Sequence, residues 1–537
     1  MMRHAIAGYL VDVVRRRVAA GTLTIDAGRV VSLVEHPIER GPFIMPGFVD
    51  SHIHIESSMM PPSSFAQLAI RHGTVATVSD PHEIANVLGI AGIEYMLDSA
   101  RGSPLKFHFG APSCVPATQF ETAGAHLDVD AVRKLLMRDD IWYLSEMMNY
   151  PGVLAGELEV LGKIAAAHAL GKPVDGHAPG LRGSQAKEYI ASGISTDHEC
   201  VTLEEAQDKL AHGMKILIRE GSAARNYEAL KSLLATHAPM SMLCSDDKHP
   251  DELLAGHIDA VVRRAVADGL PIMNVLEAAC VNPVRHYRLN VGLLQPGDAA
   301  DFIVVEDLER FRVLETWING QCVYDGQVRF EWVKPAAPNH FASGPKHAAD
   351  FSVRSNGPTS DVIVATDRQL ITDRQTHALE TIAGLLQPDV ANDILKLAVV
   401  NRYRDLPPAV GFIRGLGLRQ GAIASSIAHD SHNMVAAGVS DEMIARAINL
   451  VIDHGGGVCY VDERVAEILP LPIAGLMSDE HPNEIAARYA ALDALAKLAG
   501  SRLSAPFMTL SFMALLVIPK LKLSDRGLFD GERFALV

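Results

Sequence analysis

The fold is decided by the stretch PGFVDSHIH, residues 46–54, an apolar β-type segment that ends in two histidines. Alternate side chains of a β-strand point to one face, so His52 and His54 project together at the end of this strand. Active sites of parallel β/α barrels lie at the carboxyl ends of the strands, and two imidazoles there are suitable ligands for Zn, Mn or Fe. A chain with 23 histidines also produces such pairs by chance, so the assignment depends on the rest of the sequence.

Short β-type runs alternate with helix-type segments beyond this stretch. The predicted strands are 48–54, 74–79, 105–109, 142–147, 173–177, 194–198, 215–219 and 240–245. Helix-type stretches such as 157–170 and 251–268 lie between or after them. Eight strands that alternate with helices are typical of an α/β fold of the (β/α)8 TIM-type barrel class. We therefore predict a barrel over residues 46–283.

The regions outside the barrel predict two further units. Residues 1–45 and 284–335 are β-type, and because they flank the barrel we expect them to join in one small β-domain. Residues 335–360 are rich in Pro, Ala, Ser, Asn and Gly, which is typical of a linker. Residues 361–537 have an α/β texture and are predicted to form a separate C-terminal α/β domain.

Composition restricts the class of protein. The chain has 537 residues, 48% of them hydrophobic and 21% charged, as in ordinary globular proteins. A net charge of −16 argues against a nucleic-acid-binding surface. The six cysteines include no C-x-x-C pair, so we expect free thiols in a reducing compartment. With no signal-peptide pattern and no apolar run long enough for a bilayer, we predict a cytoplasmic protein that binds neither nucleic acid nor membrane.

Ligand-type side chains end several other predicted strands. Glu146 ends the fourth strand, His177 the fifth, His198 the sixth and Asp246 the eighth. The intervals between them are whole numbers of β/α units, so these side chains converge at one mouth of the barrel. Histidines of the core and acidic residues of the surface would not be expected to follow these regular intervals. We therefore predict one metal site, formed by His52, His54, Glu146, His177, His198 and Asp246.

This arrangement resembles the amidohydrolase superfamily, which has paired histidines on strand one, single histidines on strands five and six, and an aspartate on strand eight. Many members bridge two metal ions with a carbamylated lysine on strand four, where this chain has Glu146. A carboxylate can bridge two cations directly, as in two-metal sites with ions about 3.5–4 Å apart. The resemblance implies two divalent ions, Mn²⁺ first and Fe²⁺ or Zn²⁺ as alternatives, since histidine and carboxylate ligands accept all three.

Longer stretches narrow the family. Asp80-Pro-His-Glu-Ile-Ala-Asn86, Ser245-Asp-Asp-Lys-His-Pro250, His429-Asp-Ser-His-Asn433 and Pro506-Phe-Met-Thr-Leu-Ser-Phe512 resemble adenine deaminases of the bacterial type. With similar stretches elsewhere, the resemblance covers nearly the whole chain. It implies hydrolytic deamination of the small molecule adenine to hypoxanthine and ammonia by a metal-activated hydroxide, in purine salvage or catabolism. It also favours a homodimer or higher homo-oligomer. Lys248, where the family has arginine, is a departure that preserves the charge.

Three residues are candidates for proton transfer. Asp246, beside the metals, is suited to accept a proton from the attacking water and then to protonate the leaving amine. His82 and Glu83 follow the second strand at the same mouth and are candidates to protonate or hydrogen-bond ring atom N1 of the purine. For Glu83 the alternative is a helix N-terminal acid that interacts with the helix dipole, and both interpretations stay open.

Other polar features are interpreted as structural. The sequence His429-Asp430-Ser431-His432 contains the residue types of a hydrolytic triad. Triad partners come from separate segments, and neighbours on an extended chain point to opposite faces, so we interpret it as a polar turn that can approach the barrel mouth. Cys114 and Cys244 are expected to act as small buried hydrophobic residues.

Two functions are alternatives to deamination of adenine. A cyclic-amide hydrolase, such as a dihydroorotase or hydantoinase relative, shares the metal set, but these relatives usually carry the strand-four lysine that Glu146 replaces. A barrel without activity that serves only in association predicts missing ligands, and none of the six is missing from the sequence.

Overall fold

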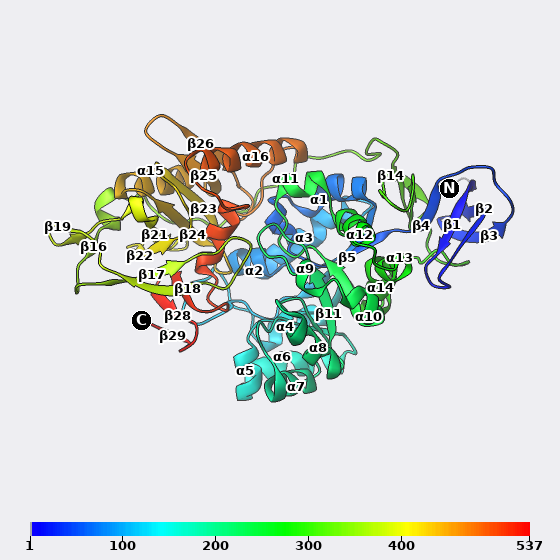
Figure 1. The fold of residues 1–537 in the computed structure, drawn as a ribbon, viewed down its shortest axis with the longest axis horizontal. Helices are drawn as coiled ribbons and strands as arrows, with labels where there is room; N and C mark the ends of the chain where they lie inside the picture. The colour runs from blue at the N-terminus through cyan, green and yellow to red at the C-terminus, as the bar shows by residue number, and fades with distance from the viewer. Residues whose placement is uncertain (1–2) are drawn as a thin grey trace.

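The computed structural model describes residues 3–537. Figure 1 shows three parts along the long axis: the N-terminal strands at one end, a β/α barrel in the middle and the C-terminal unit at the other end. Among the described residues, no helix has both the length and the apolar character needed to cross a membrane.

Parallel strands form the central barrel. The first run, in spatial order, is β5 (Phe48–Ile53), β6 (Thr74–Ser79), β7 (Lys106–Ala111), β8 (Ile141–Met147) and β9 (Val174–Gly176). The second run is β10 (Thr196–Asp197), β11 (Lys215–Arg219) and β12 (Ser241–Cys244). Strands such as β5 and β6 are buried along their whole length, as expected for parallel strands covered on both faces.

Backbone contacts join the two runs into a closed barrel. Ser195 N donates to Val174 O at 2.9 Å between β9 and β10, and Asp246 N donates to His52 O at 2.9 Å between β12 and β5. The strand ends that carry the predicted ligands therefore meet at one mouth. The predicted barrel fold is confirmed, and each predicted strand overlaps an observed one.

Helices surround the barrel. They are α1 (Pro62–Ala69), α2 (His82–Leu88), α3 (Ile90–Arg101), α4 (Val129–Leu136), α5 (Tyr150–Ala155), α6 (Leu158–Ala169), α7 (Gly183–Ala191), α8 (Leu203–Ala211), α9 (Tyr227–Leu230), α10 (Leu233–Thr236), α11 (Pro250–Ala255), α12 (Ile258–Ala267), α13 (Ile272–Leu276) and α14 (Asn282–Tyr287). The helix predicted over 157–170 corresponds to α6.

The single helix predicted over 251–268 is wrong. The structure has two helices, α11 and α12, separated by Gly256 and His257 in non-helical conformations. His257 turns into the barrel, where its Nε2 lies 2.7 Å from Asp50 Oδ2 and its Nδ1 lies 2.7 Å from Thr74 Oγ1. These buried polar contacts across the fold replace the continuous helix that the local pattern predicted.

A mixed sheet, with both antiparallel and parallel strand pairs, lies beside the barrel. It contains β1 (His4–Asp12), β2 (Arg17–Asp26), β3 (Arg29–Glu35), β4 (Phe43–Pro46), β13 (Phe302–Val305), β14 (Val313–Ile318) and β15 (Gln321–Tyr324). The spatial order is β15-β14-β13-β4-β1-β2-β3. Residues from both sides of the barrel segment therefore share one hydrophobic core, in which Leu10, Ile44 and Phe302 are buried.

The C-terminal unit is built on a mixed sheet. Its order is β18 (Asp373–His377), β17 (Ser360–Val364), β22 (Ala409–Arg414), β21 (Ile394–Val400), β24 (Asn433–Gly438), β23 (Ala422–Ala428), β25 (Gly457–Val461) and β26 (Ala466–Pro470). Small sheets contain β16 (Val353–Arg354), β19 (Thr381–Ile382) and β20 (Leu385–Leu386), and β27 (Leu521–Ser524), β28 (Gly527–Asp530) and β29 (Ala535–Leu536). The predicted linker 335–360 is thus partly regular, because it includes β16 and a short helix, η5 (Ala348–Phe351).

Three helices accompany this sheet: α15 (Asp441–Asp453), α16 (Pro482–Leu498) and α17 (Pro506–Ser511), the last followed by η7 (Phe512–Ala514). The buried side chains of α15 include Ile444, Ile448 and Val451, which lie on one face of the helix and pack on the sheet. The link between β23 and β24 is the segment 429–432, which reaches the barrel helix α2 through a contact between His429 and Glu83.

Candidate active site

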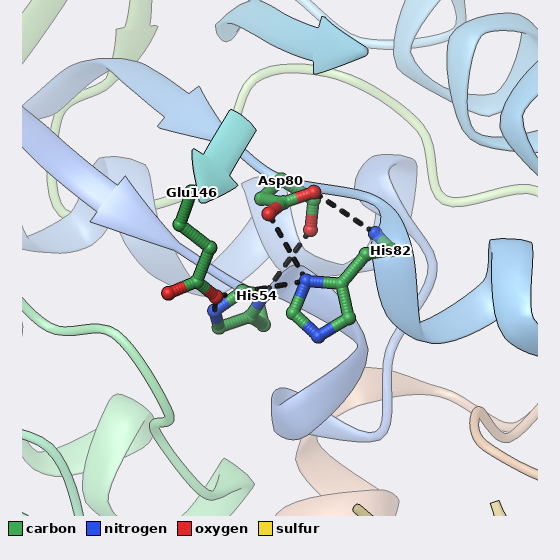
Figure 2. Close-up of side chains that lie close together, drawn as sticks. All are labelled: His54, Asp80, His82 and Glu146. Carbon is green, nitrogen blue, oxygen red and sulfur yellow. Dashed lines mark hydrogen bonds and ion pairs between the residues drawn. The ribbon is translucent and has the colours of Figure 1, made fainter. Parts of the chain in front are cut away.

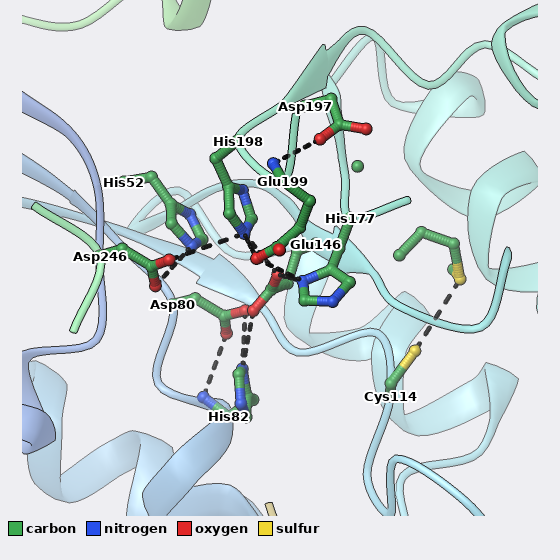
Figure 3. A network of polar contacts seen from close by, with 12 residues as sticks. His52, Asp80, His82, Cys114, Glu146, His177, Asp197, His198, Glu199 and Asp246 are labelled. Atoms are coloured by element: carbon green, nitrogen blue, oxygen red, sulfur yellow. Dashed lines mark hydrogen bonds and ion pairs between the residues drawn. The ribbon is translucent and has the colours of Figure 1, made fainter. Parts of the chain in front are cut away.

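The six predicted ligands lie together at the barrel mouth, and all are buried. Figure 3 shows His52, Glu146, His177, His198 and Asp246 directed toward a common centre from the ends of different strands. His54 completes the set from the far end of β5 (Figure 2). The structure thus brings these six side chains together at one mouth of the barrel, as the sequence predicts.

The carboxylate of Glu146 lies at the centre of the group. Its Oε1 is 3.2 Å from His54 Nε2. Its Oε2 is 2.7 Å from His177 Nδ1 and 3.2 Å from His198 Nε2. The two oxygens therefore face two different sets of imidazole nitrogens.

Asp246 closes the group on the opposite side. Its Oδ1 lies 3.3 Å from His54 Nε2 and 3.6 Å from His52 Nε2. The His52 ring stacks on the His198 ring with the centroids 4.2 Å apart. Asp246 itself has a φ of 55°, a left-handed conformation that aspartate tolerates better than most residues and that directs its side chain into the mouth.

The orientation of the imidazoles fits divalent metal ions. His54 Nδ1 donates to the carbonyl of Asp80 at 3.2 Å, which leaves the lone pair of Nε2 facing the two carboxylates. Among residues 3–537, neither ring nitrogen of His52 has a hydrogen-bond partner, and neither has Nε2 of His177. Buried lone pairs that face carboxylate oxygens are costly unless a cation lies between them. The donor set of nitrogen and oxygen atoms suits Mn²⁺, Fe²⁺ or Zn²⁺.

The electrostatics keep both carboxylates charged. Burial raises the pKa of Glu146, but His177, His198 and His54 outweigh it and hold this pKa well below its ordinary value. Burial also raises the pKa of Asp246, and Arg219 and His198 outweigh it in the same way. Burial, followed by the neighbouring His198, lowers the pKa of His52, which favours the neutral form that a metal requires.

Sequence reasoning missed three buried charged residues beside the ligands. Arg219 Nη1 donates to Glu199 Oε1 at 2.5 Å and also contacts Asp246. Glu199 Oε1 is in turn 3.4 Å from His198 Nε2. Asp80 Oδ2 lies 3.0 Å from His82 Nδ1. The sequence carried a usable signal, because each of the three residues ends a barrel strand or follows one within two positions.

The structure brings Glu83 and His82 to the same mouth from the first turn of α2. Glu83 Oε1 is 2.9 Å from His429 Nδ1, and Glu83 Oε2 contacts His432 Nε2. His82 Nε2 lies 3.6 Å from Asp430 Oδ1. The prediction that 429–432 is a polar turn that can approach the barrel mouth is confirmed. The accompanying argument from an extended chain is wrong, because the chain turns there and His429 and His432 face the same carboxylate.

The C-terminal unit also covers the site. A cavity of about 20 Å³ is lined by the ligands other than His52, together with Leu370, Phe512 and Leu515. A second cavity of about 380 Å³ is also lined by Glu199, Arg219 and Leu370. Because the two cavities share these three lining residues, they adjoin each other. We call Leu370, Phe512 and Leu515 the apolar roof.

The buried cysteines have the structural role that was predicted. Cys114 and Cys244 are buried free thiols. Burial raises the pKa of both thiols, so neither is a reactive thiolate.

Comparisons with known proteins match both large parts of the chain. Residues 43–323 match the Amidohydrolase family, and residues 369–535 match the Adenine deaminase C-terminal domain. An adenine deaminase of Sulfurovum sp. (strain NBC37-1) is 54% identical, with 98% of this chain and 98% of the relative covered. That of Salinibacter ruber is 54% identical, with 99% and 98% covered. That of Methanosarcina acetivorans is 50% identical, with 99% and 98% covered.

Proposed function

Because the chain belongs to the adenine deaminase family, its reaction is the hydrolytic deamination of adenine, and we propose that this reaction uses two divalent metal ions held at the barrel mouth. Water replaces the exocyclic amine at C6, which gives hypoxanthine and ammonia. The full-length similarity does not favour the alternative of a cyclic-amide hydrolase.

The two oxygens of Glu146 carry the proposal of two ions. His52, His54 and Asp246 would hold one ion with Glu146 Oε1, while His177 and His198 would hold the other with Glu146 Oε2. We propose Mn²⁺ as the first candidate, with Fe²⁺ or Zn²⁺ as alternatives, because this mixture of nitrogen and oxygen ligands accepts all three. When bound, such ions lower the pKa of water and make hydroxide available near neutral pH.

Asp246 and Glu83 are proposed to move the protons. Asp246 accepts a proton from the attacking water and later gives it to the departing amine, which leaves as ammonia. Glu83, with His82 beside it, gives a proton to ring atom N1 and takes one back from the new hydroxyl group as the carbonyl forms. The proton balance then closes over one turnover. Glu83 is oriented by side-chain partners on both oxygens, which supports this role over that of a simple helix N-terminal acid.

The lining of the site supports a free base as the substrate. The apolar roof offers a surface on which a flat purine can pack. Arg219 is paired with Glu199 and Asp246, so it is not available to a phosphate. We therefore propose that adenine is the substrate and that adenosine and AMP are poor substrates.

The remaining proposals concern the whole protein. We propose that it is a cytoplasmic enzyme, which the six free thiols support, since disulfides are rare in a reducing compartment. We propose a homodimer or higher homo-oligomer, which the exposed Leu498 supports because it lies in a surface groove also lined by Ile468 and Leu495. We also propose the division into 1–45 with 284–335, 46–283 and 361–537, supported by the sheet that the first two segments share.

Metal reconstitution tests these proposals. The metal-stripped enzyme is titrated with Mn²⁺ while hypoxanthine and ammonia are measured with adenine, and parallel samples receive adenosine. We expect activity to reach its full value at two equivalents and adenosine to react poorly. Full activity at one equivalent would exclude the two-ion site, and comparable rates on adenosine would exclude the preference for the free base.

A further inference from the structure

We propose that His429 and His432 of the C-terminal unit are positioning residues of the active site, which hold the Glu83 carboxylate toward the substrate ring. This inference rests on the proposed role of Glu83 in proton transfer. It gives the C-terminal unit a part in catalysis, although the metal ligands all belong to the barrel.

The two histidines contact separate oxygens of one carboxylate. His429 Nδ1 is 2.9 Å from Glu83 Oε1, and His432 Nε2 contacts Glu83 Oε2. Glu83 is 2% exposed, His429 4% and His432 0%. One partner would leave the carboxylate free to rotate, whereas one on each oxygen fixes its plane. A preset orientation of this kind is what proton transfer to a ring atom requires.

The segment that carries the histidines is itself held firmly. Tyr403 Oη donates to Ser431 O at 2.6 Å, and Arg402 Nη1 donates to His432 O at 3.2 Å. Arg402 is fully buried and without a carboxylate partner among the described residues, which is a costly placement for a guanidinium. Burial of this guanidinium against the turn supports a role for the turn that depends on its exact conformation.

Contacts with neighbouring segments set the turn against the barrel. Asn433 Nδ2 donates to the carbonyl of Thr122 in the barrel segment at 2.9 Å. His429 N donates to Ser511 O at 3.3 Å, and the His429 ring lies 4.9 Å from the Phe512 ring. The turn is thus anchored both to the barrel and to the apolar roof.

Charge complementarity supports the arrangement. Burial alone would raise the pKa of Glu83, but His429, His432 and His82 outweigh it and hold this pKa well below its ordinary value. Glu83 is therefore charged in the resting site, and His429, whose Nδ1 lies 2.9 Å from Glu83 Oε1, is placed to supply the proton that Glu83 passes to the ring and to take it back afterwards. Replacing a histidine by an apolar residue would leave a buried carboxylate oxygen without a partner.

The test compares apolar and conservative variants in the full-length, Mn²⁺-loaded enzyme. His429→Leu and His432→Leu remove the contacts. His429→Asn and His432→Gln keep a donor near the position of Nδ1 and of Nε2, respectively. Glu83→Gln tests the carboxylate directly. His454→Leu is the control, because His454 is an exposed histidine of the same unit that does not line the site and whose Nδ1 bonds to Leu450 O in its own helix.

We expect each leucine variant to lower kcat on adenine by about 10²-fold, with two metal equivalents retained and KM changed little. The Asn and Gln variants should recover most of that loss, and His454→Leu should behave as the wild type. In the Glu83→Gln background, adding His432→Leu should cause no further loss, because the group being positioned is already disabled.

Four outcomes would overturn the inference. Impaired Glu83→Gln combined with fully active leucine variants would show that the histidines do not position the carboxylate. Additive losses in the double variant, or no recovery in the folded Asn and Gln variants, would assign the histidines a structural role alone. A third metal equivalent that disappears in His432→Leu would make the cluster a cation site. Normal turnover by Glu83→Gln would instead defeat the proposed role of Glu83 on which the inference rests.

Discussion

The barrel strand ends and the 429–432 turn both bring buried histidines to the barrel mouth, but these histidines are positioned in different ways. His52 and His54 face the mouth because alternate residues of a strand share a face. His429 and His432 face it because contacts with Arg402 and Tyr403 hold an irregular turn. The first set depends on a regular repeat, and the second depends on tertiary contacts. The proposed metal ligands belong to the first set, and the proposed positioning residues belong to the second.

The largest effect is expected at the centre of the strand-end set. Glu146→Gln removes a negative charge while keeping the shape, and an amide bridges two cations poorly. We expect metal affinity and turnover to fall together, with turnover lower by about 10³-fold or more. The measurements are the metal content after gel filtration and the rate of hypoxanthine formation.

Glu205→Gln is the matched control for this change. Glu205 is also a buried glutamate, but its Oε1 accepts from Lys209 Nζ at 2.9 Å in a separate ionic cluster. We expect this variant to lose stability while its folded fraction keeps its metal and activity. Unchanged metal binding in Glu146→Gln would show that Glu146 does not bridge the ions.

The absence of a lysine at this position predicts reactivation without carbon dioxide. A lysine has to react with carbon dioxide before it can bridge two metals, whereas Glu146 already presents two charged oxygens at neutral pH. We expect the metal-stripped enzyme to regain the same activity in bicarbonate-free and bicarbonate-supplemented buffer. A clear stimulation by bicarbonate would contradict the assignment of Glu146 as the bridge.

A smaller but still large effect is expected for Asp246→Asn, which keeps the size of the side chain and removes the base. Loss of a general base lowers turnover by about 10²–10⁴-fold. The control is Asp301→Asn, which alters a fully buried aspartate paired with Lys106 outside the mouth. Near-normal turnover of adenine by Asp246→Asn would remove Asp246 from the proton path.

The sequence could predict the ligands at the strand ends because the strands of the barrel recur at regular intervals along the chain. Once His52 and His54 marked the first strand, whole β/α units placed Glu146 and His177 at the same mouth. Glu83 was located in the same way, but its partners were not. Their approach depends on how two units pack, and neither periodicity nor spacing encodes that packing.

The broken helix at His257 has the same physical explanation. The local pattern of 251–268 favours one continuous helix, with acidic residues at the start and Gly269 at the end. His257 instead turns into the barrel, where it forms buried hydrogen bonds with Asp50 and Thr74, about 200 positions earlier in the chain. Tertiary contacts overrode helix propensity there, as they determined the facing of the 429–432 turn.

The apolar roof is expected to contribute a moderate effect on specificity. Phe512→Leu removes part of the surface above the site while keeping a buried apolar side chain. We expect kcat/KM for adenine to fall by about 10-fold, mainly through KM, because this contact acts in binding. Phe529→Leu is the control, since Phe529 is equally buried but packs against Phe120 and Phe534. Equal losses in the two variants would exclude a role in recognition.

The smallest expected effect on the site concerns Lys522, which bonds to the backbone of the apolar roof and makes the stability of the fold depend on pH. Lys522 is fully buried, and its Nζ donates to Leu370 O at 2.8 Å and to Phe512 O at 3.0 Å. Burial lowers the pKa of this ammonium group to about 7. The unfolded chain, with a lysine pKa near about 10.4, then binds more protons than the folded chain between these two values.

Stability must therefore rise with pH across that window. The stability contributed by neutral Lys522 is fully present above the pKa of the unfolded chain. It is lost as the pH falls toward about 7, and the free energy of unfolding changes by at most about 1.4 kcal/mol per pH unit. Lys522→Met removes the titrating group, so unfolding curves of both proteins at several values between pH 7 and 10 isolate its share. We expect the wild type to gain stability relative to the variant as the pH rises. A difference that stays constant with pH would mean that the folded protein keeps this lysine protonated and that the carbonyls of Leu370 and Phe512 are bound by a charged group.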